Sequence, residues 1–319
     1  MQEMSTILIK NALICDGTGS APYPGAVSVR NGIIEELIPE SAALPAADRI
    51  IEAEGRVCAP GFIDIHRHAD HALFTEAFGI NELSQGLTTV INGNCGMSAA
   101  PVRDDERGRA ITAYQAPILG SAPALCETAS MRGYTDSVKA FRPALNIGTL
   151  AGLGTIVSGV NGVYGSFDRG TLPLLRNEVE KAVGEGAVGI SLGIGYRPLY
   201  AYSEDEIVDI LQPVRNSRIP LTVHMRQEGD GMPDALRECI SVARRLRVPL
   251  EVSHLKAIGV RNWEKTMPRA RSAASRTRRG SGHRLGYLSV HRRFHAAYAC
   301  AAAGSMRARK RDTAQQAAP

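Results

Sequence analysis

The stretch Phe62-Ile63-Asp64-Ile65-His66-Arg67-His68 places two histidines at the end of an apolar run. On an extended chain, side chains two residues apart point to the same side of the strand. Neutral imidazole is a common ligand for Zn²⁺. A strand that ends in His-x-His offers two ligands to one ion, so a metal site at the end of a strand is the first hypothesis that the sequence raises.

Apolar, strand-like runs recur after this stretch and alternate with helical segments. The predicted strands span residues 62–65, 87–91, 146–150, 187–192, 221–224 and 250–254. Helices are predicted between them, for example over 172–183, 203–216 and 234–247, and Ser203 and Glu206 form a capping box at the start of one of them. Apolar strands alternating with helices indicate an α/β fold with a parallel sheet. Six such units favour a (β/α)8 TIM barrel over an open sheet.

The region before this repeat has a different pattern. Residues 1–57 contain short β-rich runs, and Asn31-Gly32 separates two of them, 26–30 and 33–38. Asn-Gly between such runs is a strong hairpin signal. We therefore predict a small antiparallel N-terminal β unit, part of a β-sandwich, over 1–57 and a partial barrel with strands one to six over 58–268.

Charge is distributed unevenly along the chain of 319 residues. The net charge is +5, yet residues 269–319 alone carry twelve Lys and Arg and one acidic residue. A basic arm usually indicates a nucleic-acid or membrane surface. Aromatic residues make up only 5% of the chain, which argues against base-stacking modules. The chain shows no secretory signal and no apolar run long enough for a membrane span, so we expect a cytoplasmic protein with neither nucleic acid nor membrane as a partner.

Metal-ligand side chains follow the ends of several predicted strands, which is the edge where barrel active sites lie. His66 and His68 follow the first strand, and Cys95 follows the second in a glycine-flanked turn. His224 and His254 stand at the ends of the fifth and sixth. The other five cysteines show no disulfide or metal spacing and are expected to be reduced thiols.

Together these segments resemble the D-aminoacylase (N-acyl-D-amino-acid deacylase) family of the amidohydrolase superfamily, from about residue 5 to about residue 268. The likeness rests on His66-Arg67-His68, Gln85-Gly86-Leu87-Thr88-Thr89-Val90, Gly93-Asn94-Cys95-Gly96, His224-Met225-Arg226 and Ser253-His254-Leu255-Lys256. Most two-metal amidohydrolases use a modified lysine after strand four, where this chain has Gly189-Ile190-Ser191-Leu192-Gly193-Ile194-Gly195.

The resemblance implies a role for each of these residues. Cys95, His224 and His254 would hold a tight Zn²⁺, and His66 and His68 would belong to a second, weaker site. Lys256 would bind the substrate carboxylate and Tyr196 would line the acyl pocket. The implied reaction is zinc-dependent hydrolysis of the amide bond of N-acyl-D-amino acids.

The resemblance also implies a missing part. The family's catalytic carboxylate is an Asp at the end of strand eight, and the family pattern stops before strand seven, so the barrel is expected to be incomplete and the activity impaired. Codons can be chosen for residues 285–298 whose DNA, read one base later, encodes WDIYPYTAGSTQLM, which is similar to the family's strand seven. We therefore predict that residues 269–319 are a non-native tail translated out of frame, which the nucleotide sequence would test.

Two alternatives remain open from the sequence. The first is another amidohydrolase that acts on cyclic amides, against which Cys95 and the absent strand-four lysine speak. The second is a nucleic-acid-binding protein that uses its basic tail over 269–319.

Overall fold

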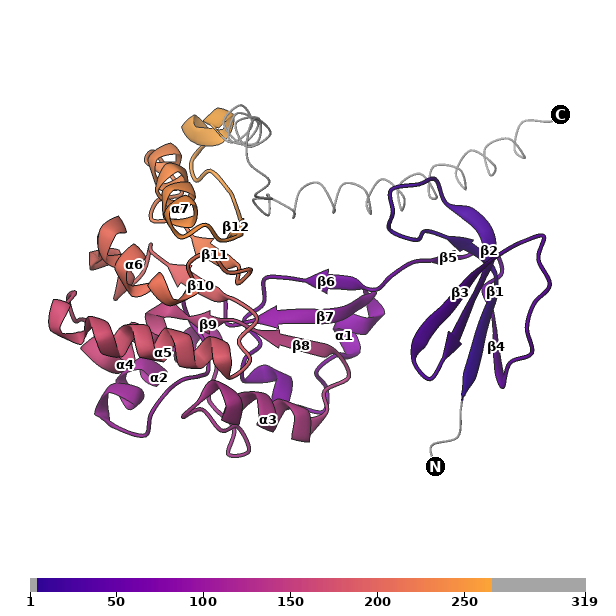
Figure 1. Ribbon diagram of the computed structural model, residues 1–319, viewed down its shortest axis with the longest axis horizontal. Coiled ribbons are helices and arrows are strands. Elements are labelled where there is room, and N and C mark those ends of the chain that lie inside the picture. The colour runs from indigo at the N-terminus through magenta and orange to yellow at the C-terminus, as the bar shows by residue number, and fades with distance from the viewer. Residues whose placement is uncertain (1–4, 266–319) are drawn as a thin grey trace. The chain divides into compact units, whose positions relative to one another are not determined.

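The computed structural model describes residues 5–265. Their contacts form two compact units: the first ends at Phe62 and the second begins at Ile63 (Figure 1). The basic tail predicted over 269–319, with its out-of-frame translation and its nucleic-acid alternative, lies outside the described residues. Within residues 5–265, every helix is too short or too polar to cross a lipid bilayer.

A five-stranded sheet makes up the first unit. Its strands are β1 (Thr6–Ile14), β2 (Tyr23–Arg30), β3 (Ile33–Pro39), β4 (Arg49–Glu52) and β5 (Val57–Cys58). The β1–β2 and β2–β3 pairs are antiparallel, and the hairpin turn at Asn31-Gly32 is confirmed by its left-handed backbone. The β4 and β5 strands pair with β1 in parallel, so the prediction of a wholly antiparallel unit is wrong. Because β5 belongs to this sheet, the N-terminal unit extends past residue 57.

The second unit contains the strands that the apolar runs predict. They are β6 (Phe62–Asp64), β7 (Leu87–Asn92), β8 (Asn146–Thr149), β9 (Ala151–Gly152), β10 (Ile190–Gly193), β11 (Leu221–His224) and β12 (Leu250–Val252). They pair in the orders β6-β7-β8 and β9-β10-β11-β12. The pairs β7–β8, β9–β10, β10–β11 and β11–β12 are parallel.

The break between these two orders falls at a single residue, Leu150. Its N–H donates to the carbonyl of Asn92 on β7, whereas the N–H of Ala151 donates to the carbonyl of Gly189, just before β10. One strand thus bonds to β7 through its first half and to β10 through its second half. Counted this way, the sheet has the six predicted strands, and β6 and β12 are its edges within the described residues.

Helices connect these strands and cover the sheet. They are α1 (Ile80–Ser84), α2 (Glu106–Leu119), α3 (Met131–Phe141), α4 (Leu153–Asn161), α5 (Leu172–Gly184), α6 (Glu204–Ile210) and α7 (Met232–Leu246). Short 3-10 turns are η1 (Ala72–Phe74), η2 (Arg169–Thr171), η3 (Leu199–Ala201), η4 (Gln212–Val214) and η5 (Val260–Lys265). The helix predicted over 203–216 ends early, since Pro213 lacks the N–H that an α-helix needs and lies in the separate turn η4.

The main core lies between the helices and strands β9 to β12. In Figure 1, α4 and α5 lie together beside β9 and β10. The side chains of Val157 in α4, Leu175 in α5, Ile190 in β10 and Leu221 in β11 are all completely buried. Helices on the outside of parallel strands are the arrangement expected of an α/β barrel, and residues 5–265 contain the six barrel strands that the sequence predicts.

The register of the strands brings their carboxyl ends to one edge. Gly193, the last residue of β10, pairs with His224, the last residue of β11. Val223 pairs in turn with Val252, the last residue of β12. Segments that follow these strands therefore begin at the same level, although they are far apart in sequence.

Candidate metal centre

Cys95 lies in a tight turn directly after β7. Gly93, Cys95 and Gly96 all have left-handed backbones, with φ of 75°, 56° and 74°. This conformation is uncommon for a residue with a Cβ, so the strain at Cys95 must be balanced by the surroundings. The N–H of Gly96 donates to Ser191 Oγ at 3.0 Å, and the Ser191 hydroxyl donates to the carbonyl of Gly93. The turn is thus anchored on β10 and holds the thiol buried.

The same turn packs against the end of β10, backbone to backbone. A Cβ on Gly193 would lie 2.1 Å from the carbonyl oxygen of Cys95. A Cβ on Gly96 would lie 2.5 Å from the backbone nitrogen of Gly193. Neither contact is possible for a real side chain, so both glycines are required for this approach.

The four predicted histidine ligands converge around this thiol, which is the fifth predicted ligand. The Cys95 Sγ lies 3.4 Å from His66 Nε2, 3.9 Å from His224 Nδ1 and 3.6 Å from His254 Nε2. The donor atoms form two groups that share the thiol, each with all its ligand atoms within 4.8 Å of one another. One group contains His66, His68 and Cys95, and the other contains Cys95, His224 and His254.

The two histidines of the His-x-His motif follow β6 and are not part of it. The strand ends at Asp64, whose carboxylate accepts from the N–H of His66 at 3.1 Å. The rings of His66 and His68 nevertheless remain neighbours, with centroids 5.3 Å apart. The Nδ1 atom of His68 is buried and has no hydrogen-bond partner among residues 5–265. A buried nitrogen without such a partner, in a side chain that belongs to one of the donor groups, is a property that a metal site explains.

The donors fit a zinc ion in both type and spacing. Thiolate and imidazole are the usual zinc ligands, and bonds of about 2.0–2.3 Å place neighbouring donors of a tetrahedral site about 3.3–3.7 Å apart. The two sulfur–nitrogen distances in the second group, 3.9 and 3.6 Å, lie close to this range. The nitrogens of His224 and His254 are closer, 2.8 Å apart, so without a cation a proton must lie between them.

The protonation of these groups also suits a cation. Burial, followed by the influence of His254, lowers the pKa of both His66 and His224 to about 4. The pKa values of His68 and His254 are also lowered, mainly by burial. All four imidazoles are therefore neutral at pH 7 and keep a free lone pair. Burial raises the pKa of the Cys95 thiol to about 12, so a thiolate here needs a positive ion beside it.

The two predicted substrate-binding residues lie next to the cluster. The Tyr196 hydroxyl is 3.1 Å from His224 Nδ1, and burial raises the pKa of Tyr196 to about 12, so its O–H stays protonated. The Lys256 ammonium group lies 2.7 Å from Glu228 Oε1 and 3.3 Å from His254 Nδ1. Both side chains are near the candidate metal ligands, while their roles toward a substrate stay predictions.

Asp70 is a supporting residue that sequence reasoning missed. Its side chain is completely buried and accepts from the N–H of Gly93 at 3.3 Å and of Ala99 at 3.2 Å. These amides lie on either side of Cys95, so one carboxylate holds both ends of its loop. Burial raises the pKa of Asp70 to about 7, and the two N–H groups oppose that shift. In the sequence, the local feature that could have drawn attention to Asp70 is its position two residues after His68.

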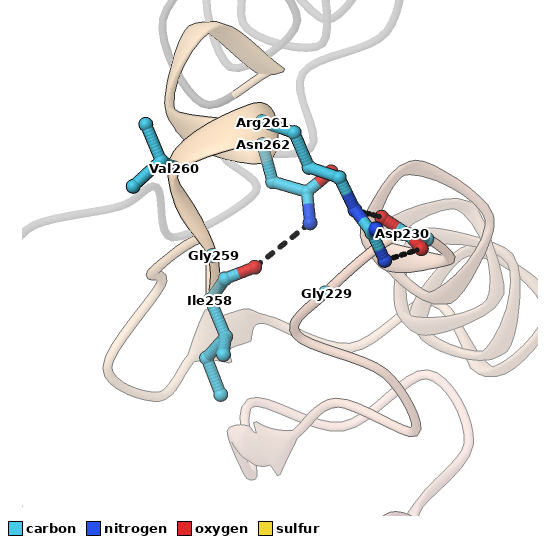
Figure 2. A pocket seen from close by; sticks show the side chains of 7 residues that line it. All are labelled: Gly229, Asp230, Ile258, Gly259, Val260, Arg261 and Asn262. Atoms are coloured by element: carbon cyan, nitrogen blue, oxygen red, sulfur yellow. Dashed lines mark hydrogen bonds and ion pairs between the residues drawn. The ribbon is translucent and has the colours of Figure 1, made fainter.

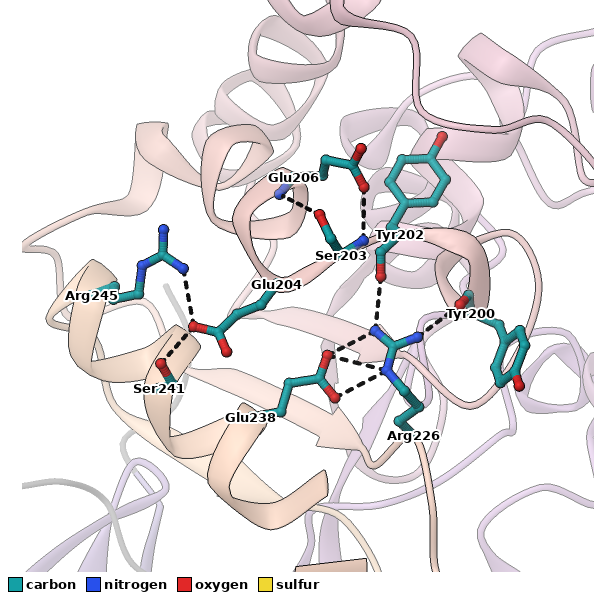
Figure 3. A network of polar contacts seen from close by, with 9 residues as sticks. All are labelled: Tyr200, Tyr202, Ser203, Glu204, Glu206, Arg226, Glu238, Ser241 and Arg245. Carbon is teal, nitrogen blue, oxygen red and sulfur yellow. Dashed lines mark hydrogen bonds and ion pairs between the residues drawn. The ribbon is translucent and has the colours of Figure 1, made fainter. Parts of the chain in front are cut away.

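Arg226 ties the loop after β10 to the loop after β11 (Figure 3). Its guanidinium donates to both carboxylate oxygens of Glu238 and to the carbonyls of Tyr200 at 2.7 Å and Tyr202 at 2.8 Å. The loop that carries Tyr196 is thereby joined to the segment that directly follows His224, the last residue of β11. A second polar link in the same view joins α6 to α7 through Glu204, Ser241 and Arg245.

We expect Arg226→Lys to lower the free energy of unfolding by about 2 kcal/mol, because lysine cannot reproduce the planar fork that bonds a carboxylate and two carbonyls together. Arg245→Lys is the matched control. Arg245 also pairs with carboxylates, but its side chain is 40% exposed against 24% for Arg226, and we expect a clearly smaller loss of stability. Urea unfolding of both variants is the measurement, and equal losses would contradict the role of Arg226.

A cleft of about 500 Å³ lies between the segments that follow β11 and β12 (Figure 2). Its walls are Gly229-Asp230 and the segment 258–262, with Arg261 paired to Asp230 and Asn262 donating to the carbonyl of Ile258. None of these residues is a candidate metal ligand. The candidate metal site is therefore formed by the converging histidines and the thiol, and the residues of the cleft contribute none of its donor atoms.

Known proteins resemble this chain over most of its described length. No family model matches it. An N-acyl-D-glutamate deacylase from Alcaligenes xylosoxydans xylosoxydans is 33% identical over 269 residues, covering 83% of this chain and 53% of the relative. A D-aminoacylase from the same organism is 30% identical over 279 residues, covering 85% of this chain and 55% of the relative.

Solved structures give the same result. A D-aminoacylase crystal structure superposes with a TM-score of 0.72 at 28% identity, over 84% of this chain and 54% of that one. The N-acyl-D-glutamate deacylase of Bordetella bronchiseptica, in complex with zinc and a phosphonate that mimics the tetrahedral intermediate, gives a TM-score of 0.77 at 29% identity, over 87% and 57% of the two chains. The present chain thus spans about half the length of the relatives that it matches.

Proposed function

Since this chain belongs to the D-aminoacylase (N-acyl-D-amino-acid deacylase) family of amidohydrolases, we propose that its metal centre binds zinc and serves the hydrolysis of N-acyl-D-amino acids to a D-amino acid and a carboxylate. The observation that carries the proposal is the convergence of Cys95, His224 and His254 on one point. These three residues lie on three different strand ends, and a shared ligand accounts for their meeting.

In this proposal Cys95, His224 and His254 hold the tighter zinc, and His66 and His68 share Cys95 with a second, weaker one. The two donor groups agree in number with the binuclear metal centre of a D-aminoacylase, whose structure is 27% identical to this chain and superposes with a TM-score of 0.72. Bound zinc would supply an activated water and polarise the scissile carbonyl.

The protein's own residues position the substrate. Tyr196 keeps its proton and presents its hydroxyl beside His224, where it can donate to an oxygen of the acyl group. Lys256 is half exposed and carries the cation that a D-amino acid's carboxylate would meet. To bind that carboxylate, the Lys256 ammonium group must either donate to the substrate and to Glu228 at once or give up its hydrogen bond to Glu228.

The proton transfer is the step for which the described residues offer no assigned group. The resemblance places a catalytic Asp at the end of strand eight, and residues 5–265 contain six barrel strands, with β8 and β9 counted as one. A positioned general base contributes about 10²–10⁴-fold to the rate. We therefore propose that deacylation by this chain is slower than that of its longer relatives by about this factor.

The test is amide hydrolysis by the zinc-loaded chain. N-acetyl-D-glutamate, N-acetyl-D-aspartate and N-acetyl-D-leucine are the probes, their L enantiomers are the controls, and the released amino acid is measured. We expect slow release from D substrates that a chelator abolishes. Equal release from the L forms, or none from any D substrate while zinc is bound, would overturn the proposal. Faster hydrolysis of a hydantoin would favour the cyclic-amide alternative instead.

A further inference from the structure

Glu228 connects the loop after β11, the strand that ends at His224, to the loop after β12, which contains His254. It follows His224 by four residues in the loop after β11, and its side chain is 10% exposed. Its backbone carbonyl accepts from the N–H of Ile258 at 2.7 Å, which bonds this loop to the one after β12. The backbone of Glu228 is therefore bonded to the loop after β12 as well as to its own loop, which limits where its carboxylate can lie.

The carboxylate contacts the outer nitrogen of a candidate ligand. Glu228 Oε1 lies 2.8 Å from His254 Nδ1, and Lys256 Nζ lies 2.7 Å from the same oxygen. A carboxylate oxygen is an acceptor, so the 2.8 Å contact favours the neutral His254 ring with its proton on Nδ1, against the competing donor Lys256 Nζ at 3.3 Å from the same nitrogen. The other ring nitrogen, Nε2, then presents its lone pair to Cys95 and His224.

This arrangement decides which form of His254 exists before a metal arrives. Imidazole in water favours the tautomer with its proton on Nε2, which would place a hydrogen where the ion belongs. A carboxylate behind the ring reverses this preference and makes Nε2 a stronger donor to a cation. Lys256, which is half exposed, balances the charge of the mostly buried Glu228 carboxylate.

We propose that Glu228 is a positioning residue that fixes the Nδ1–H tautomer and the ring orientation of His254 for metal binding. The inference rests on the metal site of the proposed function and adds to it a residue outside the ligand set. It does not depend on which acyl amino acid is the substrate.

Three variants of the 319-residue chain test it. Glu228→Ala removes the acceptor, and Glu228→Gln keeps the volume and one acceptor oxygen if the alanine variant folds poorly. Asp230→Asn is the matched control, because it removes the same charge from the same loop at a residue that pairs with Arg261. The zinc dissociation constant is measured by chelator competition, and the tautomer of His254 by ¹⁵N NMR of the zinc-free protein.

We expect zinc affinity to fall about 10- to 100-fold in Glu228→Ala, by less in Glu228→Gln, and not in Asp230→Asn. The His254 signal should change from the Nδ1–H to the Nε2–H form in Glu228→Ala alone. An unchanged tautomer, or an affinity loss equal to that of the control, would overturn the inference. Zinc binding without hydrolysis of any N-acyl-D-amino acid would refute the proposed function and leave this inference intact.

Discussion

Cys95→Ala is expected to remove about one zinc ion per chain and to weaken zinc binding by more than the ~100-fold that an outer partner of a metal ligand contributes. The thiol belongs to both donor groups, so its loss leaves two histidines in each. Two neutral imidazoles cannot offset the charge of the ion as a thiolate does. Metal content of the purified protein is the first measurement. With Co²⁺ in place of zinc, the sulfur-to-metal absorption band should also disappear.

Cys126→Ala is the matched control for this experiment. Burial raises the pKa of the Cys126 thiol to about 12 as well, although Cys126 is less buried than Cys95. Cys126 belongs to neither donor group. We expect its substitution to leave the zinc content unchanged. Zinc that is retained in Cys95→Ala would contradict the metal centre, and with it the proposed hydrolase function.

Gly193→Ala has the second large expected effect. The new Cβ would lie 2.1 Å from the carbonyl oxygen of Cys95, and backbone cannot move aside as a flexible side chain can. We expect the free energy of unfolding to fall by about 3 kcal/mol, which is the upper part of the range for overpacking. Because the displaced atom belongs to the Cys95 turn, zinc affinity should fall together with stability.

Gly159→Ala provides the comparison. Gly159 lies inside α4, and a Cβ there would meet nothing within 4 Å. Alanine in a helix is favoured over glycine by about 0.5–1 kcal/mol, so this variant should be more stable than the original chain. Urea unfolding of the zinc-free proteins separates folding from metal binding. Similar stabilities for the two variants would show that the close approach at Gly193 is not required.

Local signals in the sequence predicted most of the elements. The capping box of Ser203 and Glu206 is present at the start of α6, and the Asn31-Gly32 turn joins β2 to β3. Such signals act over two to four residues, so they can be read without the rest of the fold. The parallel pairing of β4 and β5 with β1 could not be read in this way, because it depends on contacts across about forty residues of chain.

The convergence of the candidate metal ligands was predictable for a related reason. His66, His68, Cys95 and His254 follow apolar strands and His224 ends one, and the carboxyl ends of parallel strands share an edge. Their resemblance to a known family grouped them into two sites. The assignment of Lys256 and Tyr196 to the substrate stays a prediction, since the polar contacts that the structure gives these side chains are with Glu228 and His254 for Lys256 and with His224 for Tyr196.

By itself, the sequence determined the alternation of strands and helices and the residue types that can bind zinc, because both depend on short-range pattern and on side-chain chemistry. Only the tertiary structure decided which atoms meet. The close approach of Gly193 to Cys95, the buried carboxylate of Asp70 behind the thiol's loop, and the contact of Glu228 with the outer nitrogen of His254 all join segments far apart in sequence. Their geometry follows from the register of the parallel strands and from the packing between them, which no local pattern specifies.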